Sequence, residues 1–151
     1  MNAMSARCVQ LYAFDDEAEN RSSEHEIDTA IMLLSRLPRI MCFLYHVMRD
    51  KFFGDSMFIH HYIPGQSTAE TILSMLRPDR QFTDTEAKTL DIMLMLHAEH
   101  GGGNNSTFTC RAVTSADTDP YSAYAAAIGS LKGARHGGAN NRTLRMTDDI
   151  K

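Results

Sequence analysis

Three short segments of the sequence have the residue pattern of helix N-termini, and they predict an almost entirely helical chain. Each places a serine or threonine three positions before a glutamate: Ser23 with Glu26, Ser67 with Glu70, and Thr83 with Glu86. With this spacing, the hydroxyl and the carboxylate can each pair with a backbone N–H group that the first turn of a helix leaves without a partner. Pro78 should stop the second of these helices. We therefore expect an all-α fold.

The helix expected after Ser23 carries apolar residues at close to the helical period. Its predicted core side contains Ile27, Ile31, Leu34, Leu37, Met41, Leu44 and Met48. Pro38 lies inside this pattern and cannot donate a hydrogen bond to the carbonyl of Leu34, so we expect it to kink or break the helix. Residues 52–65 combine aromatic side chains with glycine and proline, which indicates an irregular connection.

The helix expected after Thr83 leads to His97, and between residues 90 and 96 it is apolar on nearly every face. A helix of this kind is buried on all sides, inside a large protein or at a subunit interface. A chain of 151 residues offers little material to surround it. We therefore predict that a partner subunit covers this helix.

Glycine, asparagine and proline divide the rest of the sequence. The glycines at 101–103 should end the preceding helix, and Asn104 or Asn105 should cap the next, which extends to about Ala116. Asp119 and Pro120 are the residue types preferred at the start of another helix. That helix should end at Gly133. A turn at 135–138 and a final helix from about Asn140 or Thr143 are expected to follow.

The composition excludes several classes of function. The formal net charge is −4 and no block of basic residues is present, which argues against a nucleic-acid partner. We expect no membrane partner, because the longest apolar runs are too short to cross a bilayer and no segment resembles a secretory signal. Cys8, Cys42 and Cys110 are scattered and odd in number, as is typical of reduced thiols in the cytoplasm.

Three histidines beside glycine clusters form the strongest candidate site. Histidine changes charge near neutral pH and can serve as an acid, a base or a donor to a developing negative charge. His97 and His100 precede the glycines at 101–103, and two more glycines directly follow His136. Glycine lets a ligand or another backbone segment approach closely. These glycines fit neither a dinucleotide-binding nor a phosphate-binding loop, and no residue sits in a nucleophile elbow.

Each histidine also has a more ordinary interpretation. His97 fits a structural role, bonded to a carbonyl in the core, as well as a role in binding. A His-x-x-His pair alone is weak support for a metal, since zinc sites use further ligands in a recognisable arrangement. His100 stands where the helix breaks, near the amide of Asn104, which suits carboxylate binding. The histidines expected to be solvated or at the edge of the core are His46, His60 and His61.

Two motifs within residues 94–142 carry a family resemblance. The first is LHAEHGGGN at 96–104, and the second is DPYSAYAAAIGSLKGARHGGAN at 119–140, with a Ser/Thr-rich helix between them. In residue types and spacing they resemble the corresponding motifs of the citrate synthase family. The resemblance implies an all-α enzyme that condenses acetyl-CoA with oxaloacetate to give citrate and CoA. Relatives in the family use propionyl-CoA and make 2-methylcitrate.

The resemblance also implies roles for single residues. His136 matches the family's catalytic histidine, which hydrogen-bonds the thioester carbonyl and stabilises the enolate formed when the acetyl methyl group loses a proton. His100 matches a histidine that binds oxaloacetate, and Asn104 and His97 are expected to bind substrate with it. No metal or cofactor is implied, because acetyl-CoA is a substrate. The helices beside residues 97–103 match elements that pack across the family's dimer axis, so a homodimer is expected.

Two departures from the family pattern bear on these expectations. Ala134 stands where a proline usually precedes the catalytic histidine, and this should loosen the turn. The family's second catalytic histidine, in a G-[FY]-G-H motif, and its catalytic aspartate have no counterpart here. We therefore expect residues 1–151 to form part of the large helical domain, without the small domain, and not to turn over alone. The alternatives are a non-catalytic helical dimer and a fragment of a 2-methylcitrate synthase.

Overall fold

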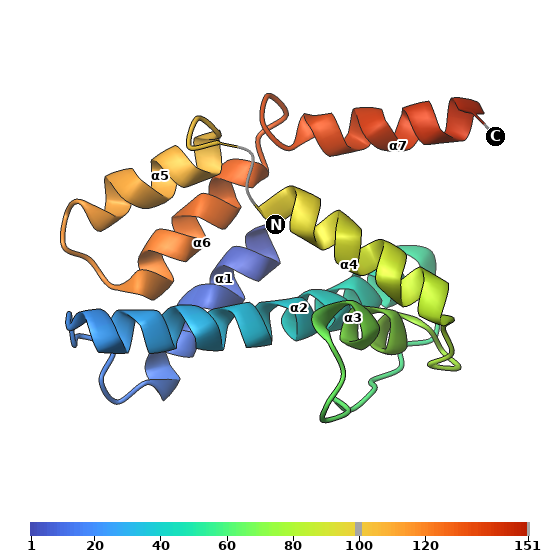
Figure 1. Ribbon diagram of the computed structural model, residues 1–151, viewed down its shortest axis with the longest axis horizontal. Coiled ribbons are helices and arrows are strands. Elements are labelled where there is room, and N and C mark those ends of the chain that lie inside the picture. The colour runs from blue at the N-terminus through green and yellow to red at the C-terminus, as the bar shows by residue number, and fades with distance from the viewer. Residues whose placement is uncertain (99–100, 151) are drawn as a thin grey trace. The chain divides into compact units, whose positions relative to one another are not determined.

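A computed structural model describes residues 1–98 and 101–150 of the chain (Figure 1). All the regular secondary structure in these two ranges is helical, which confirms the predicted all-α fold. The chain divides into two compact units. The first unit comprises Met1–Glu26 and Gly101–Lys151, and the second comprises Ile27–His100.

The first unit is built around α6 (Pro120–Leu131), which contacts both α1 (Asn2–Leu11) and α5 (Asn105–Thr114). The 3-10 turn η1 (Tyr12–Phe14) follows α1, and α7 (Gly138–Ile150) ends the unit. Small side chains on α6 allow neighbouring helices to approach closely, and Ala123 and Ala125 are buried there with Cys8 of α1. Every one of these α-helices except α1 was predicted from the sequence.

The predicted helix starts in the first unit are confirmed in detail. The side chain of Asn104 accepts a hydrogen bond from the Thr107 N–H at 2.8 Å and caps α5. Asp119 caps α6, with Pro120 in the first turn. Two boundaries differ from expectation. α5 ends at Thr114 instead of Ala116, and α7 begins at Gly138 instead of at Asn140 or Thr143.

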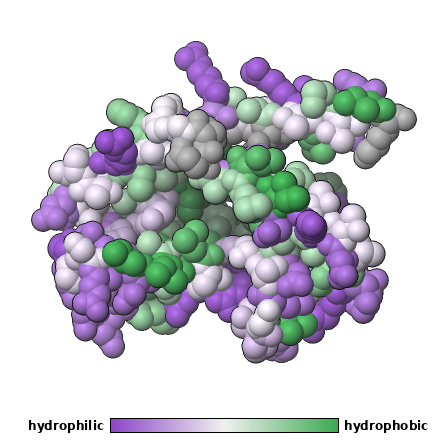
Figure 2. Space-filling view, in the orientation of Figure 1, coloured by the Kyte–Doolittle hydropathy of each residue, from purple (hydrophilic) through white to green (hydrophobic). Residues whose placement is uncertain are grey.

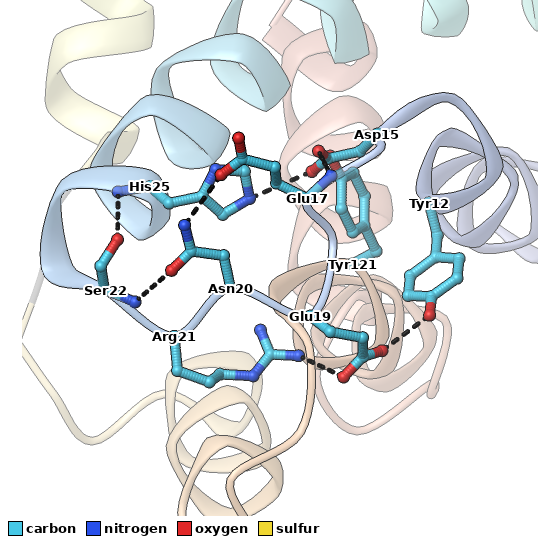
Figure 3. A network of polar contacts seen from close by, with 9 residues as sticks. All are labelled: Tyr12, Asp15, Glu17, Glu19, Asn20, Arg21, Ser22, His25 and Tyr121. Atoms are coloured by element: carbon cyan, nitrogen blue, oxygen red, sulfur yellow. Dashed lines mark hydrogen bonds and ion pairs between the residues drawn. The ribbon is translucent and has the colours of Figure 1, made fainter.

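A polar network joins the segment after η1 to α6 (Figure 3). Tyr121 is fully buried, and its hydroxyl donates to Asp15 Oδ2 at 2.7 Å. His25 Nε2 lies 3.2 Å from the same carboxylate oxygen. Burial works to raise the pKa of Asp15, but hydrogen bonds from Tyr121 and the Glu17 amide, with the charge of His25, together hold it below its ordinary value. The network therefore anchors the beginning of the chain on the central helix of the unit.

The second unit contains most of α2 (Ser23–Phe53), together with α3 (Thr68–Leu76) and α4 (Asp84–Ala98). Its buried apolar residues are Leu33, Cys42, Ala69, Ile72 and Ala87. α3 packs against α4. The segment between α2 and α3 has no helix or strand, as predicted for the glycine- and proline-containing stretch.

The core side predicted for α2 is wrong. Its buried residues are Thr29, Leu33, Cys42 and His46, whereas Ile31 and Leu34 are 59% and 73% exposed. Apolar residues occupy more than one face of α2, so periodicity alone could not select the face that packs. The buried face is the one whose side chains reach main-chain carbonyls on α3, as Cys42 and His46 do.

Two local predictions for α2 also need correction. Ser22, not Ser23, caps the helix, because Ser22 Oγ accepts a hydrogen bond from the His25 N–H at 3.3 Å. Pro38 lies inside α2 without breaking it. A proline removes only one hydrogen bond of the helical ladder, and the other bonds of this 31-residue helix are enough to continue it past Pro38. The predicted kink stays a prediction.

The two other predicted helix starts are confirmed in the second unit. Ser67 and Glu70 form a capping box at α3. At α4, Glu86 N–H donates to Thr83 Oγ1 at 3.2 Å, and Thr83 N–H donates to Glu86 Oε2 at 2.8 Å. Arg77, at the end of α3, donates to Glu86 Oε1 at 2.5 Å and thereby links the two helices.

The Glu86 cluster predicts a dependence of stability on pH. A hydrogen bond from Arg77, then bonds from the Thr83 amide and hydroxyl, lower the pKa of Glu86 from 4.5 to about 2. Since the folded pKa is depressed, the stabilisation is complete above pH 4.5 and is lost as the pH falls toward about 2. We expect Glu86→Gln to reduce this acid-dependent loss, as measured by thermal unfolding followed by circular dichroism at pH about 6 and about 3. Equal pH dependence in both proteins would contradict the prediction.

Candidate functional site

His136 lies in the turn between α6 and α7, in the first unit, with its side chain half-buried. Two main-chain hydrogen bonds close this turn: His136 N–H and Gly137 N–H both donate to the Gly133 carbonyl, at 3.0 and 2.8 Å. The turn is therefore closed by its own backbone although Ala134 stands where the family pattern has proline. The predicted loosening by Ala134 remains a prediction.

Gly137 is required by close packing of the backbone in this turn. A Cβ atom at Gly137 would lie 2.0 Å from the carbonyl oxygen of Leu131, far inside van der Waals contact. No side chain fits there without moving the backbone. At Gly138, by contrast, a Cβ atom would meet nothing within 4 Å. The glycine directly after His136 thus has a physical reason that the sequence alone did not provide.

Ser106 of α5 contacts the His136 ring, and sequence reasoning missed it. Its Oγ lies 2.7 Å from His136 Nε2 and 3.0 Å from the main-chain oxygen of Ala127 on α6. Ser106 is 30 positions before His136 in the sequence. Its one local signal was its place in the first turn of a Ser/Thr-rich helix, two residues after the cap Asn104, and that position alone does not distinguish it from its neighbours.

The direction in which the Ser106 hydroxyl donates determines which nitrogen of the His136 ring carries the proton. The hydroxyl has one proton and two neighbours able to accept it, Ala127 O and His136 Nε2. If it donates to Ala127, Nε2 must donate to Ser106. If it donates to Nε2, the neutral ring carries its own proton on Nδ1. Among residues 1–98 and 101–150, no hydrogen-bond partner of Nδ1 occurs. In the second arrangement the ring therefore presents a free donor.

Asn104 has a structural task in addition to its predicted one. Its Oδ1 accepts from the Thr107 N–H, and its Nδ2 donates to Thr107 Oγ1 at 2.6 Å. These bonds hold the side chain at the N-terminus of α5, two residues before Ser106. One Nδ2 hydrogen is left for another acceptor. The substrate contact predicted for Asn104 stays a prediction.

His97 belongs to the second unit, near the end of α4. Its Nδ1 lies 2.6 Å from the Met93 carbonyl. A carbonyl can only accept, so Nδ1 carries the proton and Nε2 is the acceptor in the neutral ring. The predicted bond to a carbonyl is confirmed, but the expected position in the core is wrong, because His97 is exposed. His100 lies outside the described residues.

The remaining histidines are structural in part. His46 is buried, contrary to expectation, and its Nε2 lies 2.8 Å from the Met75 carbonyl. His60 Nε2 lies 2.9 Å from the Arg77 carbonyl. Both rings contact Phe58 in a tilted arrangement, and together they satisfy carbonyls at the end of α3 that the helix leaves unpaired. Over residues 1–98 and 101–150, no group of histidine, cysteine and carboxylate side chains is arranged to hold a metal ion.

The end of α4, predicted to be apolar on nearly every face and buried on all sides, is exposed within this chain. Ile92, Met93, Met95 and Leu96 are 44%, 50%, 62% and 71% exposed. Figure 2 shows hydrophobic surface over the final turns of α4. Exposed apolar clusters of this kind mark interaction surfaces in soluble proteins. No helix within the described ranges is long and apolar enough to cross a membrane.

Comparison with known proteins adds an independent observation. A family model described as "Citrate synthase, C-terminal domain" matches residues 1–151. This chain belongs to the citrate synthase family. The match confirms the resemblance seen in the two motifs, and it extends over the whole sequence instead of over residues 94–142 alone.

Individual members of the citrate synthase family agree with this assignment. The chain is 33% identical to a citrate synthase of Heyndrickxia coagulans over 156 residues, which cover 100% of the chain and 38% of the relative. It is 33% identical over 151 residues to a 2-methylcitrate synthase of Shewanella oneidensis, with the same coverage of 100% and 38%. A citrate synthase of Deinococcus radiodurans is 50% identical over 68 residues, covering 45% of the chain and 18% of the relative. The chain thus spans well under half the length of these relatives.

Proposed function

We propose that this chain contributes the enolate-stabilising part of an active site that condenses acetyl-CoA with oxaloacetate to give citrate and CoA. The observation that carries the proposal is the pairing of His136 Nε2 with Ser106 Oγ at 2.7 Å, in a turn that only glycine at 137 permits. Membership of the citrate synthase family supports it. Acetyl-CoA is a substrate in this proposal, and no metal takes part.

The proposed chemistry follows from the tautomer of His136. With the Ser106 proton on the Nε2 side, Nδ1–H of His136 donates to the thioester carbonyl oxygen. When a base removes a methyl proton of acetyl-CoA, negative charge develops on that oxygen, and the donor stabilises it. Removing one such donor typically costs about 3–4 kcal/mol in comparable sites. The enolate carbon then attacks the keto carbon of oxaloacetate, and hydrolysis of the thioester releases CoA.

We assign the binding of oxaloacetate to His100, Asn104 and His97, following the family motif. The remaining hydrogen on Asn104 Nδ2 and the acceptor Nε2 of His97 support polar contacts with a ligand. The family's base and its second catalytic histidine do not occur among these 151 residues. We therefore expect these residues on their own to bind substrates weakly and not to release CoA.

A titration of the 15N-histidine-labelled chain tests this function. With oxaloacetate present, millimolar acetyl-CoA should move the ring signals of His136, whereas CoA, which lacks the acyl carbonyl, should leave them in place. Ser106→Ala should weaken the response, because Nε2 loses the hydroxyl that can donate to it and so leave the ring's own proton on Nδ1. Equal responses to acetyl-CoA and CoA, or none to either, would refute the proposed role. CoA release that depends on His136 would refute only the expected inactivity.

The acyl chain of the substrate is a second question that the comparisons raise. A 2-methylcitrate synthase is as similar to this chain, at 33% identity, as a citrate synthase is. Repeating the titration with propionyl-CoA distinguishes the two. A stronger His136 response to propionyl-CoA than to acetyl-CoA would favour 2-methylcitrate as the product.

We also propose a cytoplasmic location, in which the free Cys8, Cys42 and Cys110 stay reduced.

We further propose that the chain forms a homodimer through the exposed apolar end of α4. Contact with a second copy would bury Met95 and Leu96, which are 62% and 71% exposed. Leu96→Glu should shift the chain toward monomer in sedimentation equilibrium, because a charge in an apolar interface is costly. Lys88→Glu, an exposed change earlier on the same helix, is the matched control. A monomeric wild-type chain, or a dimer indifferent to Leu96→Glu, would rule out this interface.

The alternative from a different class of function is a non-catalytic helical dimer. It shares the α4 interface with the proposed enzyme but predicts no specific response of His136 to an acyl thioester. The titration with acetyl-CoA and CoA therefore separates the two.

A further inference from the structure

We infer that Asn105 is a positioning residue for His136. Asn105 is the first residue of α5, and its neighbour Asn104 already provides the cap. The side chain of Asn105 instead crosses to α6, where Nδ2 donates to Ser130 Oγ at 2.6 Å. The inference rests on the role proposed above for His136, and it adds a residue to which neither the motifs nor the family match assign a role.

Two consecutive residues of α5 thus reach two positions on α6. Asn105 bonds to Ser130, and Ser106 bonds to the main-chain oxygen of Ala127. Positions three apart on a helix lie on one face, one turn above the other. The pair of bonds therefore fixes both the rotation of the first turn of α5 and its height along α6. With only one of the two hydrogen bonds, either the rotation of this turn or its height along α6 could still vary.

The first turn of α5 needs this restraint. The helix has no fully buried residue, and its Ser/Thr-rich sequence forms helix only moderately well. Ser106 must nevertheless hold its hydroxyl within reach of Ala127 O and His136 Nε2 together. Small rotations of the first turn would break one of those contacts.

Ser130 also stands where the His136 turn begins. Its carbonyl accepts a hydrogen bond from Gly133 N–H at 3.2 Å, and the Gly133 carbonyl in turn closes the turn at His136 and Gly137. Asn105 therefore joins the element that carries Ser106 to the start of the element that carries His136. Loss of the Asn105–Ser130 bond should loosen the Ser106–His136 contact from both sides.

A double-mutant cycle read on the His136 ring tests this inference. In the substrate-free, 15N-histidine-labelled full chain, where Ser106 donates to Ala127 O and His136 Nε2–H donates to Ser106, Asn105→Ala and Ser130→Ala should each raise the solvent-exchange rate of Nε2–H by about three- to tenfold, the range expected for one net hydrogen bond. The double variant should exceed neither single variant, because both remove the same bond. Ser115→Ala is the control, since Ser115 caps the far end of α5 and its hydroxyl bonds back to Ala112 O of the same helix at 2.7 Å.

A conservative variant separates positioning from loss of the helix. In Asn105→Asp the carboxylate can accept a hydrogen bond from the Ser130 hydroxyl, so the cross-helix bond persists with its direction reversed, and an acid at this helix position is favourable. Exchange at the His136 ring should then stay close to wild type. Additive effects in the cycle, or unchanged exchange in Asn105→Ala with a native circular dichroism spectrum, would overturn the inference.

None of these readouts requires substrate, so the two proposals fail separately. If acetyl-CoA never affects the His136 signals, the proposed enolate-stabilising role of His136 is wrong. The double-mutant cycle measured by solvent exchange still decides whether Asn105 positions the ring. If Asn105→Ala changes the response to acetyl-CoA or oxaloacetate without changing exchange at the ring, Asn105 contacts substrate and the positioning role is wrong.

Discussion

Gly137→Ala is expected to distort the turn that holds His136 and to separate the His136 ring from Ser106. The added Cβ atom would lie 2.0 Å from the Leu131 carbonyl oxygen. The obstacle is backbone at the end of α6, which cannot rotate away as a flexible side chain would. Forcing extra atoms into such a site typically costs about 1–3 kcal/mol, and the backbone must shift to accept it. Because His136 is the adjacent residue, its ring moves with that shift.

The matched control for this prediction is Gly138→Ala. A Cβ atom there meets nothing within 4 Å, and position 138 begins α7, where alanine favours helix more than glycine does. Urea unfolding and the ring signals of labelled His136 should therefore be almost unchanged in Gly138→Ala and strongly changed in Gly137→Ala. Similar behaviour of the two variants would mean that the turn is more adaptable than its backbone contact implies.

Tyr121→Ala is expected to cause the largest loss of stability in the first unit. Tyr121 is the largest fully buried side chain of the chain's described residues, with 0% exposure, and its ring contacts Tyr12 edge-on. Truncating a buried aromatic residue to alanine typically costs about 3–5 kcal/mol, because transfer energy is lost and a cavity remains. Urea unfolding should show this loss. A loss below about 1 kcal/mol would indicate that the site collapses around alanine.

Tyr121→Phe separates the contribution of the hydroxyl from that of the ring. The ring still packs, but Asp15 loses the hydrogen bond that Tyr121 donates at 2.7 Å, at a typical cost of about 1–3 kcal/mol. That bond helps to lower the pKa of Asp15, so its stabilisation is present above the ordinary pKa of the carboxyl and is lost as the pH falls through the folded value. The variant should therefore lose less stability than the wild type on acidification. An unchanged acid dependence would mean that the hydroxyl does not set this pKa.

Where helices begin was predictable because the decisive contacts are local. The boxes at Ser67 and Thr83, the Asn104 cap and the Asp119 cap each join residues within four positions, so the sequence states both partners. α1 escaped notice because no side chain caps it and its amphipathic pattern is weak. The helix is held in position by Ser5 and Cys8, whose side chains donate hydrogen bonds to carbonyls on α6, more than a hundred positions away in the sequence.

The candidate site could be predicted only as a set of residue types. Glycine neighbours and the family motif drew attention to His136, His97 and Asn104. The motif does not, however, give the distances between these side chains. Ser106 has nothing in its local sequence that separates it from Ser115 or Thr109. Its importance comes from the packing of α5 on α6, which brings its hydroxyl to His136 Nε2.

The sequence by itself therefore determined the helical class, most helix boundaries and the citrate synthase resemblance, since all three depend on residue types at short, fixed spacing. Tertiary structure decided which face of α2 is buried, why residue 137 must be glycine, and which hydroxyl meets the His136 ring. These features join groups whose distance is set by packing and not by the covalent chain. No local pattern encodes the 2.0 Å approach at Gly137 or the 2.7 Å contact of Ser106 with His136.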